Sequence, residues 1–146
     1  MKNSLSLWRD ICDRFALQSQ CQSRQVGCII VNEDRIIGQG YNGAPVHSDC
    51  ENCMRCKNKA PIGQKLDIAI CTHAESNAIG YCARHGISTR GATLYTTLTP
   101  CVECAKLIIT AGIVEVISFN TYDNIDQIAI TTELFKNASV KHRIYG

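Results

Sequence analysis

Long apolar runs are absent from this 146-residue sequence. Its first fifteen residues, MKNSLSLWRDICDRF, place charged side chains among the apolar ones. A secretory signal needs a continuous apolar segment, and a bilayer-spanning helix needs about 20 predominantly apolar residues. The sequence therefore predicts neither a secretory signal nor a membrane span, and we expect a cytoplasmic protein without a membrane partner.

A strong excess of charge of either sign is also missing. Fifteen Lys and Arg residues stand against thirteen Asp and Glu residues, which leaves a formal net charge of +2. Electrostatic capture of nucleic acids or anionic membranes needs a much larger basic excess, so we expect no stable nucleic-acid partner and favour a small ligand. The chain length and the 45% hydrophobic content suffice for one compact domain over residues 1–146.

Proline is scarce, and its distribution sets one segment apart. Two of the three prolines lie within residues 42–71, which also hold four of the ten cysteines. This stretch interrupts the alternation of helical and extended patterns, so we expect an irregular cysteine-rich insertion that needs a ligand to order it.

Outside the insertion, helical and extended patterns alternate without internal repeats. The first two strands should form a hairpin around Glu33 and Asp34. Strands that alternate with helices through short loops indicate an α/β fold, with a mixed sheet and helices packed on its faces. The expected elements are helices over about 5–18, 73–85, 101–111 and 124–138, and strands over 26–32, 35–41, 92–97, 114–119 and 142–144.

The ten cysteines are more typical of metal ligands or buried thiols than of disulfides in a cytoplasmic chain. The segment TLTPCVECAK places Pro100 directly before Cys101 and Cys104. Since proline favours a helix start, both thiolates would lie on one face of the first turn, where free amides and the helix dipole stabilise them. A redox pair would use the same geometry, so this motif alone leaves metal binding and thiol redox chemistry open.

A third candidate ligand comes from the sequence HAE at 73–75. His73 and Glu75 point to nearly opposite sides of a helix and converge only at its N-terminal end. That end, facing the helix after Pro100, would offer one nitrogen and two sulfurs to zinc and leave a fourth position for water, as in catalytic sites. Glu75 would then move the proton of that water. The non-catalytic alternatives are a buried cysteine pair beside a helix-starting histidine, and a closed structural zinc with Glu75 as fourth ligand.

HAE followed by PCxxC on the next helix resembles the signature of zinc-dependent nucleobase deaminases. The segments SRQVGCIIV, GYNGAP, THAESNAI, GATLYTTLTPC and CAKLIITAGI are most similar, within the cytidine/deoxycytidylate deaminase superfamily, to deoxycytidylate (dCMP) deaminases of bacterial and viral type. The resemblance implies a three-layer α/β/α sandwich around a mixed, roughly five-stranded sheet. It also implies hydrolytic deamination of dCMP to dUMP and ammonia, in which zinc activates the water that attacks C4. Carried over to this chain, it makes Glu75 the proton shuttle and makes His73, Cys101 and Cys104 the zinc ligands.

Further sites follow from the resemblance alone. It implies regulation by dCTP as activator, with Mg²⁺ as a candidate companion, and by dTTP as inhibitor, in a homo-oligomer of two or six subunits. By residue type, the glycines of GYNG equally predict a tight turn without any ligand, and the tyrosine at 122 could stack on a base or pack at the rim. The implied substrate-binding residues are Asn42, Ala74, Thr99 and Tyr122, and the implied regulatory residues are Gly40, Tyr41, Asn42 and Gly43.

Related sequences also imply a second, structural zinc ion in the insertion. Because no spacing fixes four ligands, free thiols are the alternative. The favoured ligands are Cys21, Cys50, Cys53 and Cys71, with Cys56 or His47 as substitutes. Three further cysteines fall on apolar stripes and should pack in the core: Cys12, Cys28 and Cys82.

Several alternatives stay open. The substrate could be dCTP or a 5-substituted dCMP, or adenosine in tRNA, although the last would require a larger basic surface. The protein could also be a nucleotide-binding module without enzymatic activity that zinc orders. The presence of Glu75 argues against this alternative, because a structural role needs the zinc ligands but no proton shuttle. Arg24, in the segment SRQ before the first strand, could face a nucleotide or remain a solvated charge.

Overall fold

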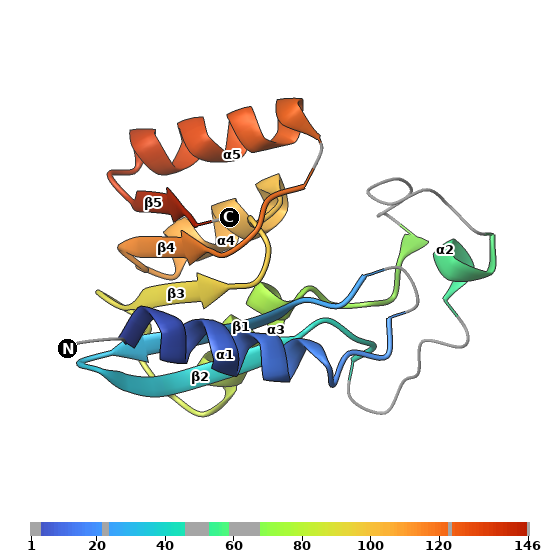
Figure 1. Ribbon diagram of the computed structural model, residues 1–146, viewed down its shortest axis with the longest axis horizontal. Coiled ribbons are helices and arrows are strands. Elements are labelled where there is room, and N and C mark those ends of the chain that lie inside the picture. Colours follow the sequence, from blue (N-terminus) through green and yellow to red (C-terminus); the bar gives the residue numbers. More distant parts are fainter. Residues whose placement is uncertain (1–3, 22–23, 46–52, 59–67, 123, 146) are drawn as a thin grey trace.

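A single mixed sheet forms the centre of the molecule (Figure 1). The computed structural model describes residues 4–21, 24–45, 53–58, 68–122 and 124–145. Within these residues, five strands lie in the order β2-β1-β3-β4-β5. β1 pairs antiparallel with β2 and β3, whereas β3, β4 and β5 are parallel, so the predicted mixed sheet is confirmed. The strands are β1 (Gly27–Asn32), β2 (Arg35–Tyr41), β3 (Thr93–Thr96), β4 (Glu115–Ser118) and β5 (Lys141–Ile144).

Helices cover both faces of the sheet, as predicted. On one face, α1 (Ser4–Ala16) buries Trp8 and Cys12 against Ile29 and Phe119. On the other face, α3 (Ala74–Arg84), α4 (Val102–Thr110) and α5 (Ile125–Asn137) pack around the larger apolar cluster, which includes Phe135. Among the described residues, no helix combines the length and the apolar composition that a bilayer span requires.

The boundaries of most elements agree with the prediction to within one or two residues. The hairpin between β1 and β2 turns at Glu33 and Asp34, whose φ angles of 50° and 59° match the left-handed turn that joins twisted strands. A short helix in the insertion, α2 (Met54–Lys57), was not predicted, because four residues are too few to show a helical period.

The two ends of the insertion lie side by side. The Gly43 amide donates to the Thr72 carbonyl at 3.1 Å, and the Thr72 amide donates back at 2.7 Å. Because His73 follows Thr72 directly, this bridge fixes the start of α3 relative to the end of β2.

Candidate active site

The predicted zinc ligands lie at the N-terminal ends of α3 and α4. His73 is the N-cap residue of α3, and Cys101 is the N-cap residue of α4. Cys104, in the first turn of α4, donates its backbone amide to the Cys101 sulfur at 3.5 Å. Pro100 therefore lies one residue before the cap rather than inside the helix. Its carbonyl accepts a hydrogen bond from Thr131 of α5 at 3.2 Å, which holds this helix start in place.

These three side chains form one compact donor group. The ligand atoms of His73, Cys101 and Cys104 all lie within 4.8 Å of one another, and Nδ1 of His73 is 3.4 Å from each sulfur. One nitrogen and two sulfurs at this separation suit a tetrahedral zinc ion. No other group of this kind occurs among the described residues.

The electrostatics of the donor group also favour a cation. The hydrogen bond from Cys104 and the neighbouring His73 lower the pKa of the Cys101 thiol to about 4. The same sulfur–sulfur contact, together with burial, raises the pKa of Cys104 well above its usual range. The hydrogen bond to Cys101 in turn raises the pKa of His73. Cys101 is therefore the sulfur that more readily carries a negative charge, and a zinc ion requires deprotonated thiolate ligands.

Glu75 lies beside the donor group but is not part of it. Its side chain is buried, and its Oε1 accepts a hydrogen bond from Thr96 at 3.2 Å. The mutually close ligand atoms do not include the Glu75 carboxylate, which speaks against a closed site with Glu75 as fourth ligand. Burial raises the pKa of this carboxyl, as suits a group that must accept and release a proton near neutral pH.

Two side chains that support the site were missed from the sequence. Thr96 lies on β3 and contacts Glu75, and the Ser76 hydroxyl lies 3.7 Å from the Cys104 sulfur. The spacing of three between His73 and Ser76 on one helix was an available signal. No local signal marks Thr96, because its partner lies 21 residues away in the sequence.

The four implied substrate-binding residues differ in their burial and in their hydrogen bonds. Ala74 is fully buried at the start of α3, and Thr99 donates both its amide and its hydroxyl to the Asn120 carbonyl. Asn42 accepts from the Val26 amide at 2.8 Å and donates to the Arg24 carbonyl at 2.6 Å, so both ends of its amide hold the segment before β1. Their contacts with a substrate stay predictions.

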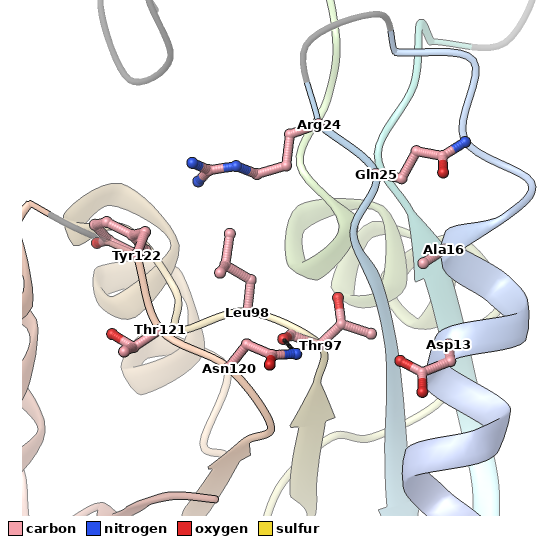
Figure 2. A pocket seen from close by; sticks show the side chains of 9 residues that line it. All are labelled: Asp13, Ala16, Arg24, Gln25, Thr97, Leu98, Asn120, Thr121 and Tyr122. Carbon is pink, nitrogen blue, oxygen red and sulfur yellow. Dashed lines mark hydrogen bonds between the residues drawn. The ribbon is translucent and has the colours of Figure 1, made fainter. Parts of the chain in front are cut away.

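The fourth residue, Tyr122, lines a pocket of about 370 Å³ beyond the ends of β3 and β4. Figure 2 shows Arg24 extending over Leu98 toward Tyr122, whereas the Tyr122 hydroxyl points away from Arg24 and donates to the Pro100 carbonyl at 3.5 Å. The Arg24 guanidinium lies 5.8 Å from the centre of the Tyr122 ring. The Tyr122 side chain is therefore placed where it can contact a ligand.

The GYNG segment lies at the end of β2 and makes structural contacts within the chain. A Cβ atom at Gly40 would overlap the Ala74 carbonyl and the Ala78 amide, so the glycine permits β2 to pack against α3. The Tyr41 carbonyl accepts from the Asn77 side chain at 2.7 Å, and Gly43 forms the bridge that closes the insertion. The prediction of a tight turn at GYNG is wrong, because Gly40 and Tyr41 are the last residues of β2 and Gly43 pairs with Thr72 in an isolated bridge. The regulatory role of these residues stays a prediction.

The predicted second zinc site lies partly outside the described residues. Cys50, His47 and the side chain of Cys56 belong to the part that is not described. Of the remaining favoured ligands, Cys53 is buried, and Cys21 and Cys71 are partly buried. The described side chains of this set are not gathered into a mutual donor group. The predicted core cysteines Cys12, Cys28 and Cys82 are all fully buried, which confirms that prediction.

Comparison with known proteins connects this geometry to a family. The family model for the cytidine and deoxycytidylate deaminase zinc-binding region matches residues 2–120. The deoxycytidylate deaminase of Schizosaccharomyces pombe is 35% identical over 143 residues, which cover 96% of this chain and 43% of the yeast protein. The deoxycytidylate deaminase of Mycobacterium phage D29 is 38% identical over 113 residues, which cover 73% of this chain and 87% of the phage protein. The chain thus spans less than half the length of the yeast relative.

A solved structure agrees with these relatives. The dCMP deaminase from cyanophage S-TIM5, in complex with dCMP and dUMP, is 26% identical and superposes with a TM-score of 0.78 over 99% of this chain and 98% of the phage chain. The match includes both layers of helices and the segments that carry the donor group. By its sequence, its fold and its His-Cys-Cys donor group, the chain belongs to the cytidine and deoxycytidylate deaminase zinc-binding family.

Proposed function

We propose that this protein is a deoxycytidylate deaminase, which converts dCMP and water to dUMP and ammonia. The observation that carries the proposal is the donor group of His73, Cys101 and Cys104 with the buried carboxyl of Glu75 beside it. The names of the yeast and phage relatives and of the cyanophage structure support dCMP as the substrate.

Each residue has a defined task in this reaction. His73, Cys101 and Cys104 would hold the zinc ion, which when bound supplies a Lewis acid that makes hydroxide available at neutral pH. Glu75 takes the proton from the attacking water and delivers protons to the ring nitrogen and to the amine that leaves C4 as ammonia. Thr96 holds one oxygen of Glu75, so the other oxygen can carry the proton. The buried surroundings of Glu75 exclude competing water from this transfer.

The decisive test measures ammonia release from dCMP by the wild-type protein and by Glu75→Gln, with zinc per chain determined for both. The amide cannot take up the proton, so we expect turnover to fall by about 10²- to 10⁴-fold while zinc stays bound. Glu103→Gln is the matched control, because Glu103 lies in the first turn of α4 with its side chain 81% exposed. Cytidine, dCTP, single-stranded DNA and tRNA should be tested alongside dCMP.

One result would refute the proposal. If the zinc-loaded wild-type protein released ammonia from no cytosine compound, even with dCTP and magnesium added, the protein would act on another base or serve as a zinc-ordered binding module.

The same proposal includes a second zinc ion and nucleotide control. Cys21, Cys50, Cys53 and Cys71 would bind the second ion, which would order the insertion between β2 and α3. Two observations support this set: Cys21 lies close enough to His73 to influence its pKa, and Cys71 directly precedes the bridge at Thr72. Activation by dCTP with Mg²⁺, inhibition by dTTP and assembly into a dimer or hexamer rest on the sequence resemblance.

A further inference from the structure

One serine at the start of α3 contacts a predicted zinc ligand of α4. The Ser76 hydroxyl lies 3.7 Å from the Cys104 sulfur, in a hydrogen-bond contact between residues 28 positions apart in the sequence. Ser76 follows His73 by three positions, so both side chains reach the first turn of α4 from the start of α3. The contact therefore belongs to the packing of α3 against α4 at the donor group.

The Ser76 hydroxyl has no competing partner among the residues that the structure describes. Its one hydrogen-bond contact there is with the Cys104 sulfur. A serine inside a helix commonly donates to the carbonyl four residues earlier. Here that carbonyl belongs to Thr72, and it already accepts from the Gly43 amide at 3.1 Å. The hydroxyl is therefore available to the sulfur.

The two sulfurs of the donor group differ in the kind of donor that faces them. The Cys101 sulfur accepts from the Cys104 backbone amide at 3.5 Å, whereas the Cys104 sulfur faces the Ser76 hydroxyl. A thiolate that binds a metal carries no proton, so with zinc in place the hydroxyl has to be the donor. One contact thus comes from the backbone, and the other depends on a single side chain that can be replaced.

The charges at the site give this side chain a task. Two thiolates and the Glu75 carboxylate would place three negative charges beside one divalent ion, and both Cys104 and Glu75 are buried. A buried charge is costly unless hydrogen bonds compensate it. A hydrogen bond also draws electron density from a thiolate, which then donates less to the ion and leaves it a stronger Lewis acid.

We infer that Ser76 is a positioning residue that donates a hydrogen bond to the Cys104 thiolate and thereby makes a bound zinc ion a stronger Lewis acid. Ser76 acts through Cys104 rather than on the substrate. This inference rests on zinc binding at the donor group, as in the proposed function. It adds to the site a side chain that belongs to neither of the motifs HAE and PCxxC.

The test compares Ser76→Ala with Ser76→Thr, which keeps a hydroxyl at the same position. Each protein is loaded with Co²⁺ in place of zinc, because the sulfur-to-cobalt absorption band reports the electron density on the thiolates. The Kd of zinc and the kinetics with dCMP are measured in parallel. Cys104→Ser identifies the part of the band that belongs to the donor group. Thr110→Val is the matched control, because it removes an exposed hydroxyl that donates to the Lys106 carbonyl within α4.

We expect Ser76→Ala to move the band to longer wavelength, because a sulfur without the hydrogen bond transfers its electrons at lower energy. The Kd of zinc at the donor group should rise about tenfold, and kcat for dCMP should fall about tenfold. Both values are at the lower end of the range for residues that hydrogen-bond to a metal ligand. Ser76→Thr and Thr110→Val should resemble wild type. In the Cys104→Ser background, Ser76→Ala should cause no further change in the band.

The cobalt spectrum separates this inference from the proposed function. If the wild-type protein did not turn over dCMP but the band moved as expected, the proposed function would fail and the role of Ser76 would stand. A band and a zinc Kd in Ser76→Ala equal to those of wild type would overturn the role of Ser76, even if kcat fell. A shift that persisted in the Cys104→Ser background would overturn it as well. If Ser76→Ala failed to fold, Ser76→Thr and the equally sized Ser76→Val would decide, because identical bands in these two variants would contradict donation by the hydroxyl.

Discussion

Thr96 has one hydroxyl proton and two acceptors within reach. Its Oγ1 lies 3.2 Å from Oε1 of Glu75 and 3.0 Å from the Leu98 carbonyl. The first contact orients the proposed proton shuttle, and the second shapes the turn that leads to the pocket. Because Thr96 is fully buried, no solvent water replaces either contact when the hydroxyl is removed.

Replacement of Thr96 by Val should separate these two roles. Valine keeps the volume but cannot hold Oε1, so we expect kcat for dCMP to fall about tenfold, with KM and zinc content little changed. Thr96→Ser, which restores the hydroxyl, should recover most of kcat. Steady-state kinetics of the two variants provide the measurement. A change in KM without a change in kcat would show instead that Thr96 serves the turn at Leu98 and not Glu75.

Site residues could be predicted from the sequence when their partners lie close to them along the chain. His73 and Glu75, and likewise Cys101 and Cys104, are pairs close in sequence at helix starts, so their residue types and spacing were sufficient. Thr96, in contrast, touches Glu75 only because β3 lies beside the start of α3. For Arg24, the sequence left a solvated charge and a ligand contact open, because the pocket that favours a contact is assembled from three distant segments.

At the scale of elements, the packing of β2 against α3 sets the position of the proposed catalytic helix. Gly40 on β2 faces the first turns of α3, where a Cβ atom would lie 2.7 Å from the Ala78 amide and closer still to the Ala74 carbonyl. The contact is with backbone atoms, so it cannot be relieved by a change of rotamer. Gly43, in the same GYNG motif, has no positive φ, and a Cβ atom there would meet nothing within 4 Å.

Gly40→Ala should therefore destabilise the protein, and Gly43→Ala should not. We expect Gly40→Ala to cost about 1–3 kcal/mol through overpacking, which corresponds to a fall in Tm of several degrees. The matched variant Gly43→Ala should stay within about 1 kcal/mol of wild type. Thermal unfolding of both proteins gives the comparison. Equal stability of the two variants would mean that the close approach of β2 and α3 does not constrain position 40.

Most helices and strands could be predicted because each has its own apolar periodicity and is bounded by residues that favour a turn or a helix start. The turn at Glu33 and Asp34 and the start of α4 after Pro100 are examples, since polar turn residues and proline act locally. The pairing of Gly43 with Thr72 could not be predicted, because it joins two residues separated by the whole insertion. The parallel order of β3, β4 and β5, by contrast, follows from the helical crossovers between them.

At the scale of the whole molecule, the donor group joins two helices of one layer, α3 and α4, which are separated along the chain by β3. His73 caps α3, which packs on β1 and β2, and Cys101 and Cys104 begin α4, which follows β3. A zinc ion bound here would connect these parts directly. An ion that binds the folded chain more tightly than the unfolded chain raises the free energy of unfolding. The increase grows with the logarithm of the ratio of the ion concentration to its Kd.

Removal of zinc should therefore lower the stability of the entire domain. We expect a chelator to reduce Tm by on the order of 10 °C. This is the shift expected for a domain of this size when it loses a ligand that was present at about a thousand times its Kd. In Cys104→Ser, the decrease in Tm on zinc removal should be smaller, because this variant cannot bind the ion at the donor group. Cys12→Ala is the control: burial raises the pKa of the Cys12 thiol to about 12, so this cysteine stays neutral, and the variant should be less stable but keep the full zinc-dependent shift.

Zinc per chain, measured on the same three proteins, assigns the shift to its sites. If the second site forms, wild type and Cys12→Ala should each bind two ions, and Cys104→Ser should bind one and keep a residual dependence of Tm on zinc. If wild type bound one ion and Cys104→Ser bound none, the result would support zinc binding at the donor group and would refute the second site. A full zinc-dependent shift in Cys104→Ser would contradict the donor group itself, because the stabilising ion would then bind elsewhere.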